Sequence, residues 1–211
     1  MSTVKRRTYR STIRRGEAAG LICAAAHHLF STKGYIATSI EDIAVEAGVA
    51  RPTVFTAVGS KPIILKAVVD QAMAGDDAPV PLAARLWFTE AVAEPDPVRS
   101  LHLHLRNVCS ILQRVVFVLR ALETAAAIDD DAAALWSDVR RQRRTGTANI
   151  AADLAGKTTL RCSEQMLADM LFAVPPDAYY RLVHEEGWPV ETFHAWFVDV
   201  LQRVCLPDGP T

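Results

Sequence analysis

Hydrogen-bond donors are grouped in residues 34–61 of the sequence, beside two segments with helical apolar spacing. Thr38 and Ser39 stand just before the first segment, and Ser60 and Lys61 stand just before a later one. Backbone amides at a helix N-terminus, together with hydroxyl and ammonium groups, suit the oxygen atoms of phosphate. The grouping therefore predicts a surface that binds phosphate groups.

A further set of outward-facing side chains follows Gly48. Glycine permits the positive φ that a tight turn needs, and Val49 and Val54 are placed to anchor the next helix to a core. The spacing leaves one face of that helix for Arg51, Pro52, Thr53 and Thr56, with Phe55 at its rim. Two short helices joined by such a turn are the geometry of a helix-turn-helix, whose second helix enters the major groove of DNA.

Other motifs that could carry chemistry lack an essential residue. Residues 156–158 read Gly-Lys-Thr, like the end of a phosphate-binding loop, but Ala151 stands where that motif requires glycine. His184 and Glu185 begin like a zinc-protease helix, but Trp188 occupies the place of its second histidine. No nucleophile motif or dinucleotide fingerprint is present. We therefore expect no catalytic residue and no cofactor.

The remaining ionisable groups favour structural roles. His102 and His104 lie two residues apart, so a helix sends them to different faces, and metal binding is the less favoured alternative. A basic cluster is predicted to be a solvated or salt-bridged helix face, with a partner contact as the alternative: Arg140, Arg141, Arg143 and Arg144. Four widely separated cysteines predict reduced, structural thiols in a cytoplasmic protein: Cys23, Cys109, Cys162 and Cys205.

Apolar residues recur every three or four positions along most of the chain, which predicts an all-α fold. The expected helices cover about 17–32, 40–47, 52–58, 98–127 with a possible break near Gln113, 129–155, 164–173, 179–184 and 190–204. A further helix is expected after the cap Ser60, with Ile64, Leu65 and Val68 facing inward. Loops are expected at residues 75–81 and 94–97 because proline, glycine and aspartate are concentrated there. We expect no membrane-spanning segment and no secretory signal.

The charge of the chain is unevenly distributed. The formal net charge of the 211 residues is −1. Residues 1–66 hold ten basic and four acidic side chains, whereas the rest hold thirteen basic and twenty acidic ones. Such asymmetry favours a part that meets a polyanion. We therefore divide the chain into a basic arm (1–15), a helix-turn-helix domain (16–66) and a larger helical domain (67–211).

The helix-turn-helix region resembles the tetracycline-repressor-like (TetR) family of bacterial transcriptional regulators. The residues that carry the resemblance are Ile22, Ala26, Phe30, Gly34-Tyr35, Thr38-Ser39, Asp42-Ile43-Ala44, Ala47-Gly48-Val49, Thr53-Val54-Phe55, Ser60-Lys61 and Leu65. A weaker likeness to some family members covers Tyr179–Val183, Glu186–Trp188 and the helix of Trp196.

This resemblance implies which residues contact DNA. Phosphate contacts are expected from Thr38, Ser39 and Lys61, with Ser60 beside Lys61. Base or near-base contacts are expected from Arg51, Thr53 and Thr56, with Pro52 and Phe55 on the same face. The alternatives are that Arg51 contacts phosphate without specificity and that Phe55 is a packing residue. The sequence departs from the family at Phe55, where tyrosine is usual and its hydroxyl reaches a phosphate, and at Ala57 and Val58, where aromatic or histidine side chains are common. Ala50 replaces the usual Ser or Thr cap, which costs the recognition helix about 1 kcal/mol. The basic arm is expected to compensate by contacting phosphates or the minor groove, and the alternative is a solvated tail.

The resemblance also implies that the larger domain binds a ligand and dimerises. A ligand pocket is expected among helices of residues 98–155, with an effector that is hydrophobic or aromatic. Its candidate lining is Leu105, Cys109, Leu112, Phe117, Arg120, Glu123 and Trp136, each of which could instead be plain core. The 164–173 and 190–204 helices are expected to form the dimer interface through Met166, Met170, Phe193, Trp196, Phe197 and Val200, because they are more apolar than one subunit readily buries.

The sequence thus predicts a homodimeric, ligand-responsive DNA-binding regulator, most often a repressor in the family. It would act on a pseudopalindromic operator. The alternatives are a regulator whose larger domain binds a protein partner, and an enzyme built on a helical bundle.

Overall fold

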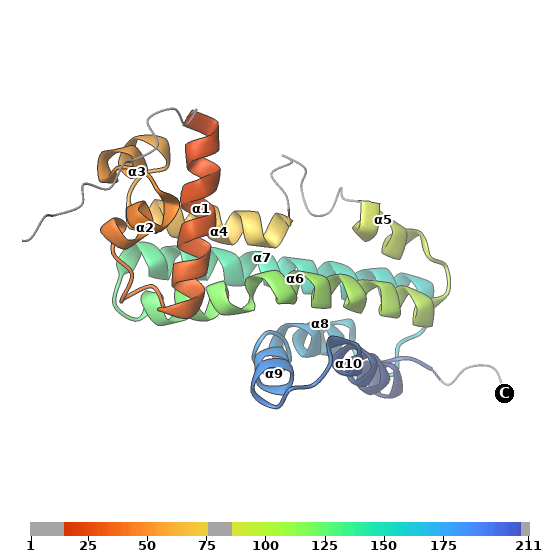
Figure 1. Ribbon diagram of the computed structural model, residues 1–211. Helices are drawn as coiled ribbons and strands as arrows, with labels where there is room; N and C mark the ends of the chain where they lie inside the picture. The colour runs from red at the N-terminus through yellow and green to blue at the C-terminus, as the bar shows by residue number, and fades with distance from the viewer. Residues whose placement is uncertain (1–14, 76–85, 208–211) are drawn as a thin grey trace, which may run out of the picture. The chain divides into compact units, whose positions relative to one another are not determined.

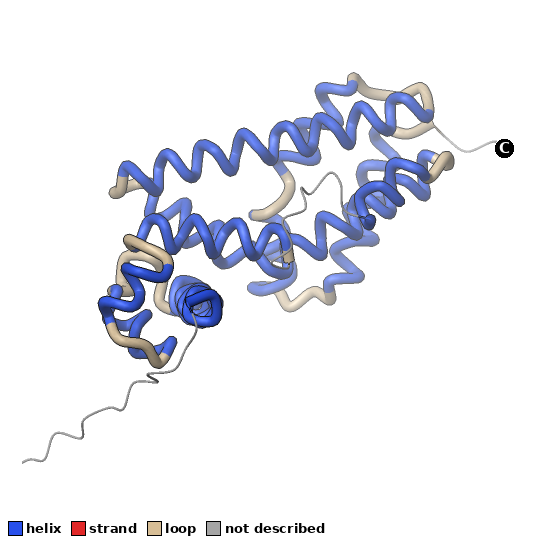
Figure 2. The backbone as a smooth tube through the Cα atoms, turned by 90° about the horizontal axis from the view of Figure 1, so that it is seen from above, coloured by secondary structure: helices blue, strands red, loops and turns tan. Residues whose placement is uncertain are grey.

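A computed structural model of the chain describes residues 15–75 and 86–207. Within these ranges the backbone forms ten α-helices and one π-helical segment and contains no strand (Figures 1 and 2). The described residues divide into two compact units, one of residues 15–71 with 117–136 and the other of residues 72–75, 86–116 and 137–207. The prediction of an all-α fold is confirmed.

The N-terminal unit is built on the first four helices. These are α1 (Arg15–Thr32), α2 (Ile40–Ala47), α3 (Arg51–Ala57) and most of α4 (Lys61–Ala74). The predicted boundaries hold: Gly34 follows α1 with a φ of 81°, and Ser39 caps α2. Each helix contributes fully buried side chains to one core, among them Ile22, Phe30, Ile43, Val54, Ile64 and Leu65.

Two long helices pass through both units. Helix α6 (Pro97–Ala126) and helix α7 (Asp130–Lys157) give residues 117–126 and 130–136 to the N-terminal unit and their remainder to the second unit. Asp129 caps α7, since its Oδ1 accepts a hydrogen bond of 2.9 Å from the N–H of Ala132. The second unit adds α5 (Leu86–Ala93), α8 (Glu164–Ala173), α9 (Asp177–Tyr179), the π-helix η2 (Tyr180–Glu185) and α10 (Val190–Cys205).

The structure corrects the helix prediction in three places. Helix α6 is continuous and shows no break near Gln113, which is exposed, because the buried face of Leu105, Leu112, Val116 and Leu119 runs past it. Helix α5 was not expected, since its eight residues follow a segment rich in proline. The helix expected at 179–184 is a short α-turn followed by a π-helix.

A buried polar cluster joins α5 to α6 and α7 in the second unit. The ammonium group of Lys157 donates to the carbonyl of Ala91, to Ser100 Oγ and to Asp153 Oδ2, at 3.2, 2.8 and 2.5 Å. The same carboxylate oxygen lies 2.9 Å from Nε2 of His104, which is 1% exposed. Sequence spacing did not reveal this set, because its members come from three helices.

Candidate nucleic-acid interface

The turn between α2 and α3 has the geometry of a helix-turn-helix. Gly48 ends α2 in the left-handed region with a φ of 68°. The N–H of Val49 then donates to the carbonyl of Ala44 at 3.0 Å, and its side chain is 2% exposed. These contacts fix the direction in which α3 leaves the turn.

Helix α3 buries one side chain and presents the others. Val54 is fully buried, whereas Arg51, Pro52 and Thr56 are exposed and Thr53 is half-buried. Phe55 is 45% exposed, which is unusual for a large apolar side chain and leaves it free to contact a ligand surface. The structure thus brings together the predicted residues of the recognition face.

Arg51 and Phe55 lie one turn apart on α3 and contact each other. The guanidinium carbon of Arg51 is 5.6 Å from the centroid of the Phe55 ring, within the range of a cation–π contact. Thr56 Oγ1 lies 3.2 Å from the carbonyl oxygens of both Pro52 and Thr53, so its hydroxyl is directed to its own helix. Arg51 carries the only charged side chain of α3, because the sequence of this helix is RPTVFTA.

The buried position of Thr38 does not fit the prediction that its side chain contacts phosphate. Its side chain is 1% exposed, and its hydroxyl donates to the carbonyl of Gly34 at 2.8 Å and lies 3.4 Å from the carbonyl of Leu29. The hydroxyl therefore closes the connection between α1 and α2 from inside. We correct its role to a structural one.

Ser39 is exposed at the N-terminus of α2, but a carboxylate already occupies that end. Asp42 Oδ2 accepts hydrogen bonds of 2.9 Å from both the N–H and the hydroxyl of Ser39, and Ser39 Oγ accepts one from the N–H of Asp42. Lys33 lies 3.4 Å from the same carboxylate. The hydrogen bonds from Ser39 hold the pKa of Asp42 below its usual value. A phosphate at this helix end would have to compete with Asp42.

Lys61, at the N-terminus of α4, is held against Tyr35. Its Nζ lies 4.0 Å from the centroid of the Tyr35 ring, and the Tyr35 hydroxyl lies 3.3 Å from Asp129 Oδ2. Burial lowers the pKa of Lys61, while the charge of Asp129 opposes that shift. Burial, followed by Asp129, raises the pKa of Tyr35. Neither Tyr35 nor Asp129 was among the predicted site residues. Ser60, beside this set, is exposed as expected.

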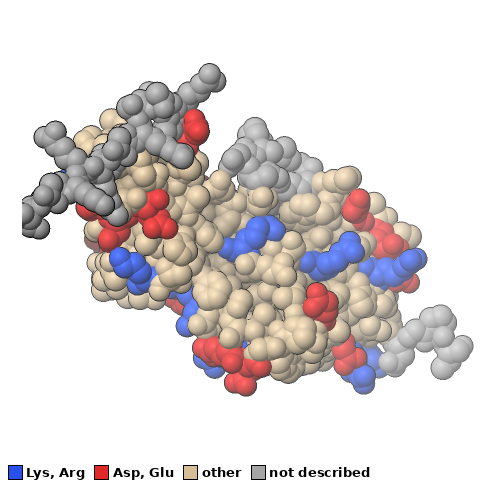
Figure 3. All heavy atoms as spheres, viewed as in Figure 1, with Lys and Arg blue, Asp and Glu red and all other residues tan. Residues whose placement is uncertain are grey.

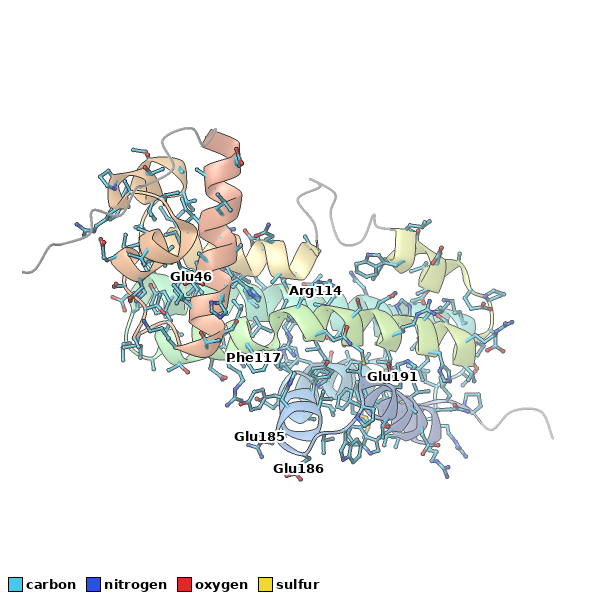
Figure 4. The ribbon with its side chains drawn as sticks, in the orientation of Figure 1. Glu46, Arg114, Phe117, Glu185, Glu186 and Glu191 are labelled. Carbon is cyan, nitrogen blue, oxygen red and sulfur yellow. The ribbon has the colours of Figure 1, made fainter. Side chains whose placement is uncertain are left out.

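Most of the net positive charge of residues 1–66 lies outside the described helices. Residues 1–14 hold five of the ten basic side chains of residues 1–66, and this part of the predicted arm lies outside the described residues. Residues 15–66 hold five basic and four acidic side chains. Helix α2 alone carries Glu41, Asp42 and Glu46. Of these, Glu46, labelled in Figure 4, pairs with His28 at 3.1 Å. On the face shown in Figure 3, basic and acidic groups are interspersed.

The predicted ligand-binding residues divide between the two units. Leu105, Cys109 and Leu112 are buried in the core of the second unit. Arg120 and Glu123 are exposed, Trp136 is half-buried and Phe117, labelled in Figure 4, is 36% exposed; all four belong to the N-terminal unit.

The predicted dimer residues divide into buried and accessible groups. Phe193 and Phe197 are fully buried within the single chain, where the ring of Phe193 lies 5.1 Å from that of Tyr179, and so they are not available to a partner. Met166 is 50% exposed, and Met170, Trp196 and Val200 are half-buried. The expectation that one subunit could not bury this apolar set was too strong, because α6 and α7 supply enough core to cover its inner face.

Comparison with known proteins gives a match at the helix-turn-helix. Residues 22–68 match the model of the family described as bacterial regulatory proteins, tetR family. Residues 22–68 thus form a DNA-binding domain of the tetR family. Comparison with curated protein sequences gives no match.

Solved structures of similar fold include tetR-family proteins, and they match along most of their length. A Saccharomonospora viridis transcriptional regulator in complex with choline superposes with a TM-score of 0.69 and 18% identity, over 91% of this chain and 99% of that one. A Clostridium perfringens protein proposed to regulate fatty acid metabolism gives 0.63 and 19%, over 86% and 95%. A Mesorhizobium loti protein assigned to the tetR family gives 0.64 and 18%, over 91% and 98%.

Other features of the chain concern the basic cluster, metals and membranes. The predicted salt-bridged face is confirmed in part: Arg141 pairs with Asp138 and Arg144 pairs with Asp169, at 2.5 and 2.6 Å. Arg143 is instead half-buried and donates to the carbonyls of Phe172 and Pro175. Within residues 15–75 and 86–207, no group of three or more potential ligands could hold a metal ion. No single described helix is long and apolar enough to cross a membrane, although α3 and α4, bent by 61°, meet the length and composition criteria as a pair.

Proposed function

We propose that this chain is a sequence-specific regulator, acting as a repressor, that binds a pseudopalindromic operator as a homodimer. The observation that carries the proposal is the recognition face of α3, on which Arg51, Thr53 and Phe55 are accessible while Val54 anchors the helix. Arginine can read guanine through two hydrogen bonds, and phenylalanine and the methyl group of threonine can contact the methyl group of thymine.

The experiment that tests the proposal is selection of binding sites by the full chain from a random duplex library. We expect an enriched motif, and binding to it should exceed binding to a scrambled duplex at physiological salt. Arg51→Ala should weaken specific binding by about 1–3 kcal/mol. Lys66→Ala is the matched control. Lys66 is an exposed cation of α4 that pairs with Asp70, so the substitution removes the same charge at a position outside α3. Equal affinity of the wild type for the motif and for the scrambled duplex would contradict the proposal.

The proposed dimer surface is the accessible stripe of α10. Trp196, Val200 and Val204 are spaced by four residues beside the buried stripe of Phe193 and Phe197, and Val204 is 40% exposed. Met166 adds an exposed apolar group on α8. An accessible apolar stripe of this kind marks a protein contact, and a two-fold dimer would present two copies of α3 to DNA.

The dimer is tested by measuring molar mass in solution. We expect the wild type to sediment as a dimer and Val200→Arg to sediment as a monomer that keeps its helical content. Ala195→Arg is the matched control, because Ala195 is exposed on α10 but lies on the stripe of Asp199 and Arg203. A wild type that is monomeric at the concentrations where it binds DNA would contradict the proposal.

We further propose that a small hydrophobic or aromatic effector releases the protein from DNA. The proposal is supported by the apolar helices of the second unit and by the choline complex of the S. viridis protein, which shares the fold. A thermal-shift screen with lipophilic, aromatic and quaternary ammonium compounds should give a ligand that also weakens DNA binding. If no compound does so and a protein partner co-purifies, the second unit has the alternative role of binding that partner.

A further inference from the structure

Two of the four cysteines are in contact although they lie far apart in sequence. The Cys162 thiol lies close enough to Cys205, near the end of α10, to raise the pKa of that thiol, and the Cys205 thiol donates to Met170 Sδ at 4.0 Å. The two backbones are also joined, since the N–H of Arg161 donates to the carbonyl of Cys205 at 2.8 Å. Both thiols are free in this structure. The remaining cysteines, Cys23 and Cys109, are buried in different units.

The two thiols differ in their access to solvent. Cys205 is 1% exposed, whereas Cys162 is half-buried. Cys162 lines a surface hollow of about 450 Å³, together with residues 155–160 and Glu164. A small oxidant can therefore reach Cys162, whereas Cys205 is closed to solvent. Burial and then the contact with Cys162 raise the pKa of Cys205 to about 12, so Cys205 keeps its proton at neutral pH.

We propose that Cys162 and Cys205 form a reversible disulfide when the protein meets a hydroperoxide. The sulfur of Cys162 attacks the peroxide oxygen that carries hydrogen, the O–O bond breaks, and Cys162 becomes a sulfenic acid. The thiol proton of Cys162 passes to the other oxygen, which leaves as water or an alcohol. The sulfur of Cys205 then attacks the sulfur of Cys162. The hydroxide of the sulfenic acid leaves, takes up the thiol proton of Cys205 and becomes water. Two electrons pass from the two thiols to the peroxide, and a reducing thiol reverses the bond by exchange.

The disulfide would tie the connection between α7 and α8 to the end of α10. The closed loop would contain α8, α9, η2 and α10, so oxidation restricts the unfolded state of this whole segment. This site is independent of the recognition face on α3. Its test therefore does not depend on whether the proposed DNA binding is correct.

The test is oxidation of the full chain by hydrogen peroxide, followed by non-reducing peptide mapping. We expect a peptide that links Cys162 to Cys205 and has lost two hydrogen atoms, and a dithiol should remove the link. Cys162→Ser should abolish the link. Cys205→Ser should leave a sulfenic acid on Cys162 that a cyclic 1,3-dione traps. Cys109→Ala is the matched control, since it removes a buried thiol of the same unit and should leave the link intact.

A second measurement guards against loss of folding in the variants. The melting temperature of the wild type should rise on oxidation by about 5 °C and return on reduction. Cys162→Ser should show no such shift. The proposal is overturned if peroxide leaves both thiols free, if Cys162 is oxidised to the sulfinic acid without the link, or if the only disulfide formed joins two chains.

Discussion

The ammonium group of Lys61 lies 4.0 Å from the centroid of the Tyr35 ring, and the hydroxyl of that ring contacts Asp129. Asp129 belongs to the turn between α6 and α7 and also caps α7. The cation at the start of α4, which we predicted to contact phosphate, is therefore attracted to a residue of the same unit that is 68 positions further along the chain. A DNA phosphate that binds Lys61 would have to compete with Asp129.

We therefore expect Asp129→Asn to strengthen DNA binding. The amide still caps α7, since asparagine is as good a cap as aspartate, but the charge that attracts Lys61 is gone. Affinity for a duplex should rise by a factor of about 2–5 at low salt, the scale of one partly screened charge contact. The measurement is a fluorescence titration. Asp130→Asn removes the same charge one residue away, and an equal rise in that control would mean that net charge alone is responsible.

The cap of the recognition helix gives a second prediction. Ala50 occupies the N-cap of α3 with extended backbone angles, φ −75° and ψ 145°, and makes no side-chain hydrogen bond. Ala50→Ser should supply the missing acceptor and raise the free energy of unfolding by about 1 kcal/mol in urea titrations. Ala57→Ser near the other end of α3 is the control and should give no gain. An Ala50→Ser variant no more stable than the wild type would show that the cap geometry is unsuitable.

Helix boundaries were predictable wherever a local residue sets them. Gly34 and Gly48 both adopt positive φ, and Ser39 and Ser163 both cap the helices that follow them. These features depend on a few neighbouring residues, so the sequence carries them. Helix α5 and the continuity of α6 depend instead on distant contacts, such as the hydrogen bond from Lys157 to Ala91.

The recognition face of α3 could be predicted from helical periodicity, whereas the contacts around that face could not. Periodicity places Val54 inward and Arg51 and Phe55 outward, as observed. Periodicity does not reveal that Thr38 is enclosed by α1, or that Asp129 reaches Tyr35, because those contacts join segments far apart in the chain. For the same reason the complete burial of Phe193 was not foreseen.

Removal of residues 1–14 should lower both the DNA affinity and its salt dependence. This segment carries five basic side chains, whereas residues 15–66 carry nearly balanced charge. Each phosphate contact that is lost should reduce the slope of log K against log salt by about 0.9. The measurement is a titration at several salt concentrations. An unchanged slope would show that the arm makes no phosphate contact, and a variant with the five basic residues changed to glutamine separates charge from length.

Phe55→Tyr should strengthen binding to any duplex. The ring is 45% exposed, so an added hydroxyl is solvated in the free protein and costs little stability. Where the hydroxyl reaches a phosphate, as the tyrosine usual in the family does, the gain should be about 1 kcal/mol on both motif and scrambled DNA. Phe55→Leu is the companion variant, because it keeps an apolar side chain and loses the contact with Arg51. A gain restricted to the motif would indicate base contact instead.

Stability of the second unit should fall as the pH drops from about 8 to 5.5. Burial lowers the pKa of His104 from its ordinary value of 6.5, although Asp153 opposes the shift, and burial also lowers the pKa of His102. Below about pH 6.5 the unfolded chain therefore binds protons that folded His104 resists, and the free energy of unfolding decreases. The pKa of Asp153 is lowered too, but its contribution is complete above its ordinary value of 3.8 and is lost only in stronger acid. Urea titrations at several pH values measure the slope. His104→Gln should flatten it more than His102→Gln, and identical slopes in the wild type and His104→Gln would contradict the assignment.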